Sequence, residues 1–226
     1  MSDALARLLA RIRTRLGRPA EARGAEEVAA RPAGRVAGPI PARARVEGEA
    51  RVALFTKMAK AVGSEVERLA HPGEVPGAVL RYLRFHNLPK RLVAAADPLL
   101  EASGLARAPL LEVRTGAVTA DDPVGITVAE AGVAETGTLV LASTPERPTM
   151  LAFLPETAVV LLPLDRLDGS YEESWQRIRE RFGTPPRSVN FVTGPSRTAD
   201  IGLRLTMGAH GPKRLLILLV DRTESA

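Results

Sequence analysis

Apolar residues near the start of the chain recur at the spacing of one helix face. They fall at i, i+3, i+4, i+7 and i+11, at Leu5, Leu8, Leu9, Ile12 and Leu16. Arginines fill the other side, so the pattern predicts an amphipathic helix over residues 3–16. We expect its apolar face to pack on the body of the protein or on a second subunit. A helix lying on a membrane surface is disfavoured because this face has no aromatic anchor.

The apolar period stops after this helix. Residues 17–46 are rich in Gly, Pro, Ala and Arg, and this composition is typical of a flexible linker. We therefore expect residues 1–48 to form an N-terminal helix and a flexible basic linker, and residues 49–226 to form one folded domain.

Within the folded domain, segments with helical periodicity alternate with short apolar runs. The predicted helices are residues 52–62, 76–85, 98–103, 149–154, 170–182 and 198–207. The predicted strands are residues 65–69, 92–96, 110–114, 125–131, 138–142, 158–162, 188–193 and 215–220. This alternation predicts an α/β fold with a mostly parallel central sheet flanked by helices. Ser170 is the expected N-cap of its helix, with Glu172 and Glu173 in the first turn.

The net charge of +5 is concentrated in the N-terminal arm. Residues 1–51 hold 11 arginines and 6 acidic residues, whereas residues 52–226 hold 20 basic and 20 acidic residues. A nucleic-acid-binding domain needs clustered cations on its own surface, so this distribution disfavours nucleic acid as a partner.

The chain contains no cysteine, which excludes disulfides, thiolate metal sites, cysteine-ligated iron–sulfur clusters and cysteine nucleophiles. The three histidines, His71, His86 and His210, do not form a metal-binding motif, so we expect no metal ligands in this chain. The longest aliphatic runs, residues 158–162 and 215–220, are far shorter than the roughly 20 residues that span a bilayer. Arginines interrupt the first apolar segment, which disfavours a signal peptide, and the cytoplasm is the expected location.

The first segment with candidate chemistry is residues 125–138, where Glu130 and Glu135 lie among apolar residues and Thr136, Gly137 and Thr138 follow. Burial of either carboxylate would raise its pKa toward the range useful for acid–base chemistry. The alternative is a purely structural turn that Thr136 and Gly137 reverse. The segment lacks the lysine of a nucleotide-binding P-loop, and the chain has no GxGxxG motif.

The second segment is residues 193–200, between a predicted strand and a predicted helix. Gly194 permits a tight turn, and Ser196 or Thr198 is the expected N-cap, so the helix start and Arg197 could bind an anion such as a phosphate or carboxylate. The alternative is an N-cap whose loop is fixed by an ion pair between Arg197 and Asp200.

The third segment is residues 208–214, which leads into the last predicted strand. His210 is a candidate acid–base group or hydrogen-bond donor. The alternative is that this histidine only ties the loop in place. The strongest spatial expectation is that all three segments meet at one edge of the sheet and form a polar recess there.

Taken together, these segments resemble the LUD-domain family. The resemblance covers residues 49–222 and is carried by the motifs GIT at 125–127, AETGT at 134–138, LPET at 154–157, VNF at 189–191, GPSRTADI at 194–201 and GAHGP at 208–212. It implies a fold like that of ribose-5-phosphate isomerase, glucosamine-phosphate deaminase and the CoA transferases.

The resemblance also implies a role. The family is encoded with two iron–sulfur proteins and is needed for the oxidation of L-lactate to pyruvate. Because this chain has no cysteine, we expect it to be the cluster-free component, with cysteine-rich iron–sulfur proteins as partners.

CoA transferases use a glutamate in a Glu-Asn-Gly setting as nucleophile, and Glu135-Thr136-Gly137 is similar with Thr in place of Asn. The alternative function is therefore a small-molecule enzyme of the CoA-transferase or sugar-phosphate-isomerase type. Such an enzyme would use Glu135 with an anion-binding loop at Ser196 and Arg197.

Overall fold

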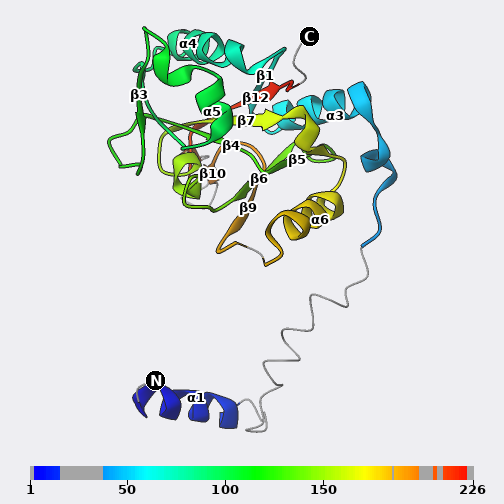
Figure 1. Cartoon of the computed structure of the whole chain (residues 1–226). Helices are drawn as coiled ribbons and strands as arrows, with labels where there is room; N and C mark the ends of the chain where they lie inside the picture. Colours follow the sequence, from blue (N-terminus) through cyan, green and yellow to red (C-terminus); the bar gives the residue numbers. More distant parts are fainter. Residues whose placement is uncertain (1–2, 16–37, 185, 199–205, 208–210, 223–226) are drawn as a thin grey trace. The chain divides into compact units, whose positions relative to one another are not determined.

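The computed structural model describes residues 3–15, 38–184, 186–198, 206–207 and 211–222 (Figure 1). The chain divides into two compact units, residues 1–39 and 40–226. The first contains α1 (Asp3–Arg15), which confirms the predicted N-terminal helix. Leu8 and Ile12 on its apolar face are exposed.

The second unit contains four α-helices and five short 3-10 helices among its described residues. The α-helices are α3 (Gly48–Ala61), α4 (Val75–Phe85), α5 (Pro98–Ala102) and α6 (Tyr171–Phe182). The 3-10 helices are η1 (Ala42–Arg45), η2 (Pro72–Glu74), η3 (Leu105–Arg107), η4 (Thr149–Ala152) and η5 (Leu164–Arg166). Within the described part of the chain, no helix is both long and apolar enough to cross a membrane.

The main sheet has six parallel strands in the order β1-β12-β7-β4-β2-β3 (Figure 1). Its strands are β1 (Glu65–Leu69), β2 (Arg91–Ala94), β3 (Glu112–Thr115), β4 (Val124–Val128), β7 (Thr157–Pro163) and β12 (Arg214–Val220). This confirms the α/β prediction. The central strands β7 and β4 are buried along their whole length, as parallel strands covered on both faces are.

A second sheet of four strands has the order β8-β5-β6-β9 and mixes parallel and antiparallel pairs. Its strands are β5 (Ala131–Val133), β6 (Thr138–Ala142), β8 (Leu167–Asp168) and β9 (Val189–Val192). A separate antiparallel pair joins β10 (Arg197–Thr198) to β11 (Thr206–Met207).

Alternate residues of the main sheet face two different cores. On β12, Leu216 and Leu218 pack into a core that α4 and α5 cover. Ile217 faces the opposite core, which α3 and the second sheet cover. A third, smaller core fills the space between the second sheet and α6, around Ile178. These layers place α6 on the side of the second sheet away from the main sheet.

The parallel register defines two edges of the main sheet. The amino edge is where its strands begin, and the carboxyl edge is where they end. Glu130 lies at the carboxyl edge because it follows β4 by two residues. Strand β5 then runs back, so that Gly137 contacts Ala59 near the end of α3, and α3 leads directly to the start of β1. The turn from β5 to β6 therefore lies at the amino edge.

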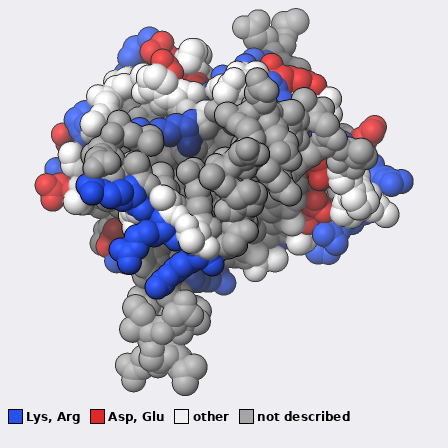
Figure 2. Space-filling view, turned by 90° about the horizontal axis from the view of Figure 1, so that it is seen from below, with Lys and Arg blue, Asp and Glu red and all other residues white. Residues whose placement is uncertain are grey.

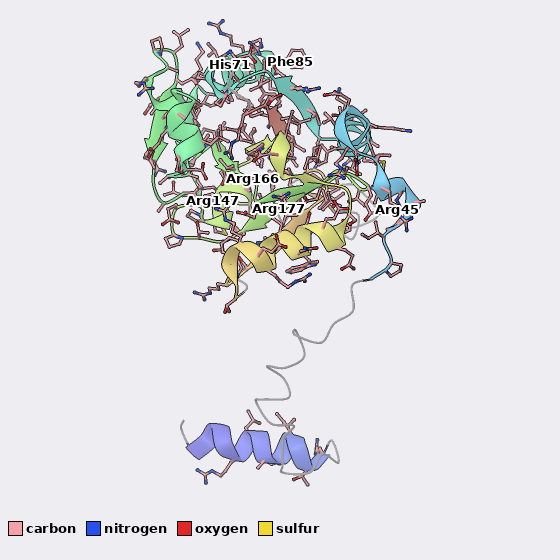
Figure 3. The ribbon with its side chains drawn as sticks, turned by 45° about the vertical axis from the view of Figure 1, so that its right-hand side comes forward. Arg45, His71, Phe85, Arg147, Arg166 and Arg177 are labelled. Carbon is pink, nitrogen blue, oxygen red and sulfur yellow. The ribbon has the colours of Figure 1, made fainter. Side chains whose placement is uncertain are left out.

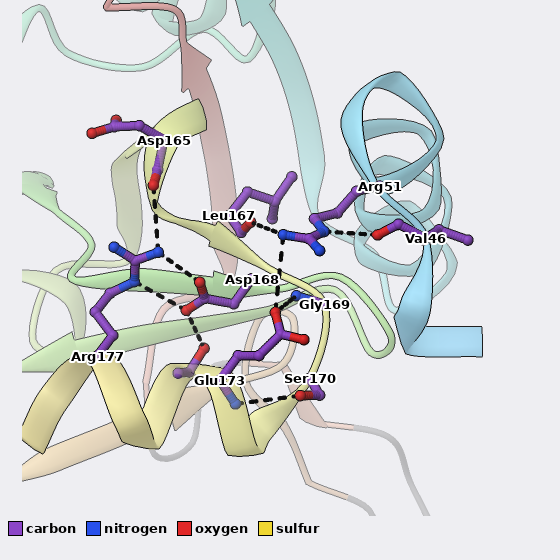
Figure 4. Close-up of polar contacts among 10 residues, drawn as sticks. Val46, Arg51, Asp165, Leu167, Asp168, Gly169, Ser170, Glu173 and Arg177 are labelled. Carbon is purple, nitrogen blue, oxygen red and sulfur yellow. Dashed lines mark hydrogen bonds and ion pairs between the residues drawn. The ribbon is translucent and has the colours of Figure 1, made fainter. Parts of the chain in front are cut away.

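The predicted cap of α6 is confirmed and is part of a larger polar network (Figure 4). The Glu173 backbone N–H donates to the Ser170 hydroxyl at 3.3 Å, and the Glu173 carboxylate accepts from the Gly169 backbone N–H at 2.8 Å. Arg51 of α3 donates to the carbonyls of Val46 and Leu167. These contacts join the start of α6 to α3 and to the residues that precede α3.

The structure overturns the linker prediction for its last residues. Ala42–Arg45 form η1, and Ala44 is fully buried. The Ala44 carbonyl packs so closely against Gly169 that a Cβ there would lie 2.0 Å from it. This packing orders a segment whose composition alone indicated flexibility. The greater part of the predicted linker, residues 16–37, lies outside the described residues.

The described ends of the predicted helix over residues 198–207 are strands. Arg197 pairs with Met207, and Thr198 pairs with Thr206, in an antiparallel ladder. The prediction is therefore wrong for residues 198, 206 and 207, and Ser196 does not precede a helix, because Arg197 and Thr198 are both strand residues. Pairing outweighs the local preference of these residues. Residues 199–205 lie outside the described part.

Candidate functional site

Four hydroxyl groups meet where the turn after β5 approaches the end of β9. The Thr138 hydroxyl lies 2.7 Å from the Thr136 hydroxyl, 2.7 Å from the Thr193 hydroxyl and 3.0 Å from the Tyr171 hydroxyl. Thr138 is fully buried, whereas Thr193 is exposed. The cluster therefore reaches from the interior to the surface at the amino edge, and it joins the first predicted segment to the second.

Gly137 fixes the shape of this turn. Its φ of 66° lies in the left-handed region, and a Cβ would lie 2.2 Å from the Ala59 backbone nitrogen. Only glycine meets both demands without strain or displacement. The turn is thus pressed against α3, and this contact sets the position of Glu135 and Thr136.

Glu135 is a buried carboxylate, only 5% exposed, with a cationic partner. Arg43 of η1 lies 3.2 Å from its carboxylate, and the side chain of Arg43 is 65% exposed. The Glu135 backbone N–H donates to the Gly169 carbonyl at 3.1 Å. Glu135 is thus fixed in place at the amino edge by Arg43 and by the Gly169 carbonyl.

The second predicted segment packs against the end of α3. Gly194 has a φ of 83°, and a Cβ there would lie 2.7 Å from the Val62 carbonyl oxygen. The guanidinium of Arg197 lies so close to Gly63 that a Cβ at that glycine would be 2.0 Å from Nη2. Because Arg197 and Thr198 form a strand, no helix starts after Ser196 to bind an anion. Of the predicted anion-binding groups at this position, only the Arg197 guanidinium applies.

The third predicted segment adjoins the second. The Ser196 backbone N–H donates to the Pro212 carbonyl at 2.9 Å, and Gly211 lies against the Ser196 side chain. Residues 135–138 of the first segment and the described parts of the second and third segments are therefore at the amino edge, whereas Glu130 of the first segment lies at the carboxyl edge. His210 and Asp200 lie outside the described residues, so the structure does not place them.

A second polar cluster, at the opposite edge, surrounds Glu130. This carboxylate is 1% exposed and accepts hydrogen bonds from Arg147 at 3.0 Å and from Arg181 at 2.6 Å. Arg147 is itself 6% exposed, and its Nε lies 3.6 Å from Asp97. Burial of three charged groups is tolerated here because each one faces an opposite charge.

Further arginines border this cluster. Arg147, Arg166 and Arg177 lie between the strands and α6 (Figure 3). Arg166 donates to the Ala129 carbonyl at 3.1 Å. Arg177 forms a two-point ion pair with Asp168, at 2.6 and 3.1 Å. We refer to Asp97, Glu130, Arg147, Arg166 and Arg181 as the carboxyl-edge cluster.

The sequence offered a partial signal for this cluster. Glu130 stood out because it follows an apolar strand, and the structure confirms that it is buried. Its arginine partners were missed, since they are 17 and 51 residues away. The sequence does single out some arginines of this region. Arg166 comes just after a buried strand, and Arg177 and Arg181 are four residues apart on one helix. Their positions in the chain do not show which of them meets Glu130.

Elsewhere, the charges of the second unit are mixed. On the face that Figure 2 shows, basic side chains stand beside acidic ones at several points. Surface ion pairs of the second unit include Arg68 with Glu49 and Arg114 with Asp122.

The comparisons with known proteins agree on one family. A family model described as LUD domain matches residues 52–220. The chain is 37% identical over 100 residues to lactate utilization protein C of Anoxybacillus flavithermus (strain DSM 21510 / WK1), covering 44% of each protein. It is 37% identical over 103 residues to lactate utilization protein C of Bacillus subtilis (strain 168), covering 44% of this chain and 43% of that relative. These alignments span less than half of the relatives' length.

Among solved structures, the chain is similar to a DUF162 family protein from Deinococcus radiodurans. The TM-score is 0.57 at 18% sequence identity, and the match covers 77% of this chain and 99% of that chain. At this identity the likeness shows the fold alone.

Proposed function

Because the chain belongs to the LUD domain family, we propose that it is the cluster-free component of an iron–sulfur system that oxidises L-lactate to pyruvate. The observation that carries this proposal is the family match over residues 52–220, together with relatives named lactate utilization protein C. We place the protein in lactate oxidation as a subunit or accessory factor.

The amino-acid composition supports the division of labour in this proposal. Iron–sulfur clusters are held mainly by cysteine thiolates, and this chain has no cysteine. Any cysteine-ligated cluster of the system must then belong to another polypeptide. The proposed partners are therefore cysteine-rich iron–sulfur proteins, and this chain contributes binding and positioning.

The first test is physical association. We expect the tagged full-length chain, co-expressed with the proposed cysteine-rich iron–sulfur partners from the same organism, to retain them through purification together with their visible absorption. A tagged protein of unrelated fold, co-expressed in the same way, is the control. Deletion of the gene should abolish growth on L-lactate but leave growth on pyruvate intact. Undiminished lactate growth after deletion, together with a chain that never retains the iron–sulfur proteins, would contradict the proposal.

A second candidate function is an independent small-molecule enzyme that uses Glu135. It is supported by the burial of Glu135 beside the hydroxyls of Thr136 and Thr138, with access from the solvent past Arg43. Under this proposal, a Glu135 oxygen bonds to the acyl carbon of a CoA ester while the carbon–sulfur bond breaks and the CoA thiolate leaves. With a sugar phosphate, Glu135 instead accepts a proton from the carbon beside the carbonyl. In both cases Arg197 binds the anionic part of the ligand.

Replacement of Glu135 with Gln should then abolish turnover while leaving the urea-unfolding midpoint nearly unchanged. The matched control is Glu156→Gln, because Glu156 is exposed and pairs only with the exposed Lys213 among the described residues. Turnover of a panel of CoA esters and sugar phosphates is the measurement. A Glu135→Gln protein as active as the control, or a wild-type protein that turns over none of the panel, rules this candidate out.

A further inference from the structure

The carboxyl-edge cluster gathers side chains from several separate elements. Asp97 follows β2, Glu130 follows β4, Arg166 ends η5 just after β7, and Arg181 comes from α6. Arg147 lies in the connection after β6. The carboxyl ends of parallel strands are the place where open α/β sheets usually bind their ligands. The cluster therefore occupies the preferred edge, whereas Glu135, Ser196 and Arg197 lie at the other.

The charges in this cluster do not balance. Three guanidinium groups, of Arg147, Arg166 and Arg181, stand against two carboxylates. Glu130 pairs with Arg147 and Arg181, and Asp97 pairs with Arg147. Within the ranges that the structure describes, no carboxylate forms an ion pair with Arg166. Arg166 is the surplus cation.

The surroundings of Arg166 raise the free energy of its unpaired positive charge. Burial lowers the pKa of the Arg166 guanidinium, and repulsion from Arg181 and Arg147 adds to this shift, whereas attraction to Glu130 and to the neighbouring Asp165 opposes it. The Arg166 guanidinium donates a hydrogen bond to a neutral acceptor, the Ala129 carbonyl. A half-buried guanidinium still carries its charge, so the free energy of the site falls when an anion joins it.

The cluster is also open to a ligand. Arg181 is 41% exposed and Arg166 is partly exposed, whereas Glu130 and Arg147 are buried beneath them. A guanidinium presents two parallel N–H donors, which match the oxygens of a carboxylate or phosphate. The buried pair of Glu130 and Arg147 fixes the base of the site, and the more exposed arginines face outward.

We propose that Arg166, with Arg181 beside it, binds a small oxyanion at the carboxyl edge of the main sheet. The ligand is a carboxylate or a phosphate of low molecular weight. The oxyanion site stands on the charges and positions of these side chains alone. The identification of the ligand as L-lactate or pyruvate, bound through its carboxylate, is the one part that rests on the proposed function.

The test is calorimetric titration of the full-length chain with L-lactate, pyruvate, acetate and inorganic phosphate, at constant ionic strength in chloride. We expect saturable binding of at least one of them, with a matching rise in the thermal midpoint because the ligand binds the folded state. Saturation by the organic acids alone identifies a carboxylate site, and saturation by phosphate alone identifies a phosphate site.

Two variants assign the binding to Arg166. Arg166→Gln should weaken it about tenfold or more, the usual effect of losing a hydrogen bond to a charged group. Arg84→Gln is the matched control, because Arg84 is an exposed arginine of α4 on the opposite side of the main sheet. If Arg166→Gln fails to fold, Arg166→Lys retains the charge and loses the two-point geometry, and it should also bind more weakly than the wild type.

Absence of saturable binding in the wild type, or equal binding by Arg166 variants and the control, would overturn the oxyanion site. Retention of the iron–sulfur proteins by Arg166→Gln is measured separately. It reports on the proposed function, so failure of one proposal is distinguishable from failure of the other.

Discussion

Replacement of Glu130 with Ala should destabilise the protein by about 3–5 kcal/mol, the usual cost of breaking a buried ion pair from one side. Glu130 is 1% exposed and holds both Arg147 and Arg181. Its loss leaves the guanidinium of Arg147, which is 6% exposed, with only the 3.6 Å contact to Asp97. The free energy of unfolding, from urea titration followed by circular dichroism, is the measurement.

The control for this prediction is Glu49→Ala. Glu49 also forms a two-point ion pair, with Arg68, but on the surface. Solvent screens such pairs, so the unfolding midpoint of the control should stay close to that of the wild type. If the two variants lose the same free energy of unfolding, the buried ion pairs of Glu130 stabilise the protein no more than a surface pair does, and the prediction is wrong.

Replacement of Gly137 with Ala should destabilise the protein more than the same change at Gly104. Both glycines have a positive φ, 66° and 72°. A Cβ at Gly104 would meet only Nη2 of Arg107, at an ordinary 3.7 Å, whereas one at Gly137 would lie 2.2 Å from the Ala59 nitrogen. The left-handed backbone of Gly104 alone should cost about 1 kcal/mol on replacement. Overpacking should add about 1–3 kcal/mol at Gly137.

Urea unfolding of both variants measures this difference, and the comparison isolates the contact with α3 from the strain of a positive φ. Equal losses at the two positions would show that the turn after β5 moves away from α3 at little cost. In that case the contact with α3 would not be what positions Glu135 and Thr136.

The strands and helices that the sequence predicted well are those whose apolar pattern is set by burial. Residues 158–162 and 215–220 form continuous apolar runs, and both are central parallel strands. Helix α6 was recognisable because Ser170 and Glu173 follow the residue preferences of a helix start. Such signals are local in the sequence, so they can be recognised without knowledge of the fold.

The errors arise where distant residues decide the structure. Residues 197–198 pair with 206–207, so both described ends of the predicted helix are strands. Ala42–Arg45 are ordered by contacts with residues more than 90 positions later, including Glu135 and Gly169. A composition rich in Gly, Pro, Ala and Arg gives no indication of such contacts.

The candidate site shows the same division. The motif at residues 134–138 indicated a turn that holds a carboxylate among apolar residues, and Glu135 is 5% exposed in the structure. The hydroxyl contacts of Thr136, Thr138 and Thr193 were not predicted. The arginines around Glu130 were not predictable from spacing, because the carboxyl edge brings together residues from five separate segments. Which edge a loop occupies follows from strand direction, and that is known only once the sheet is assembled.

The position of β12 has a consequence for how the protein is made. This strand lies between β1 and β7, so it joins the first strand of the chain to the rest of the main sheet. During synthesis, β1 has no neighbour in the sheet until residues 214–220 have emerged from the ribosome. Such late, long-range pairing is slow, so nascent chains should depend on chaperones that shield the exposed apolar edge of β7.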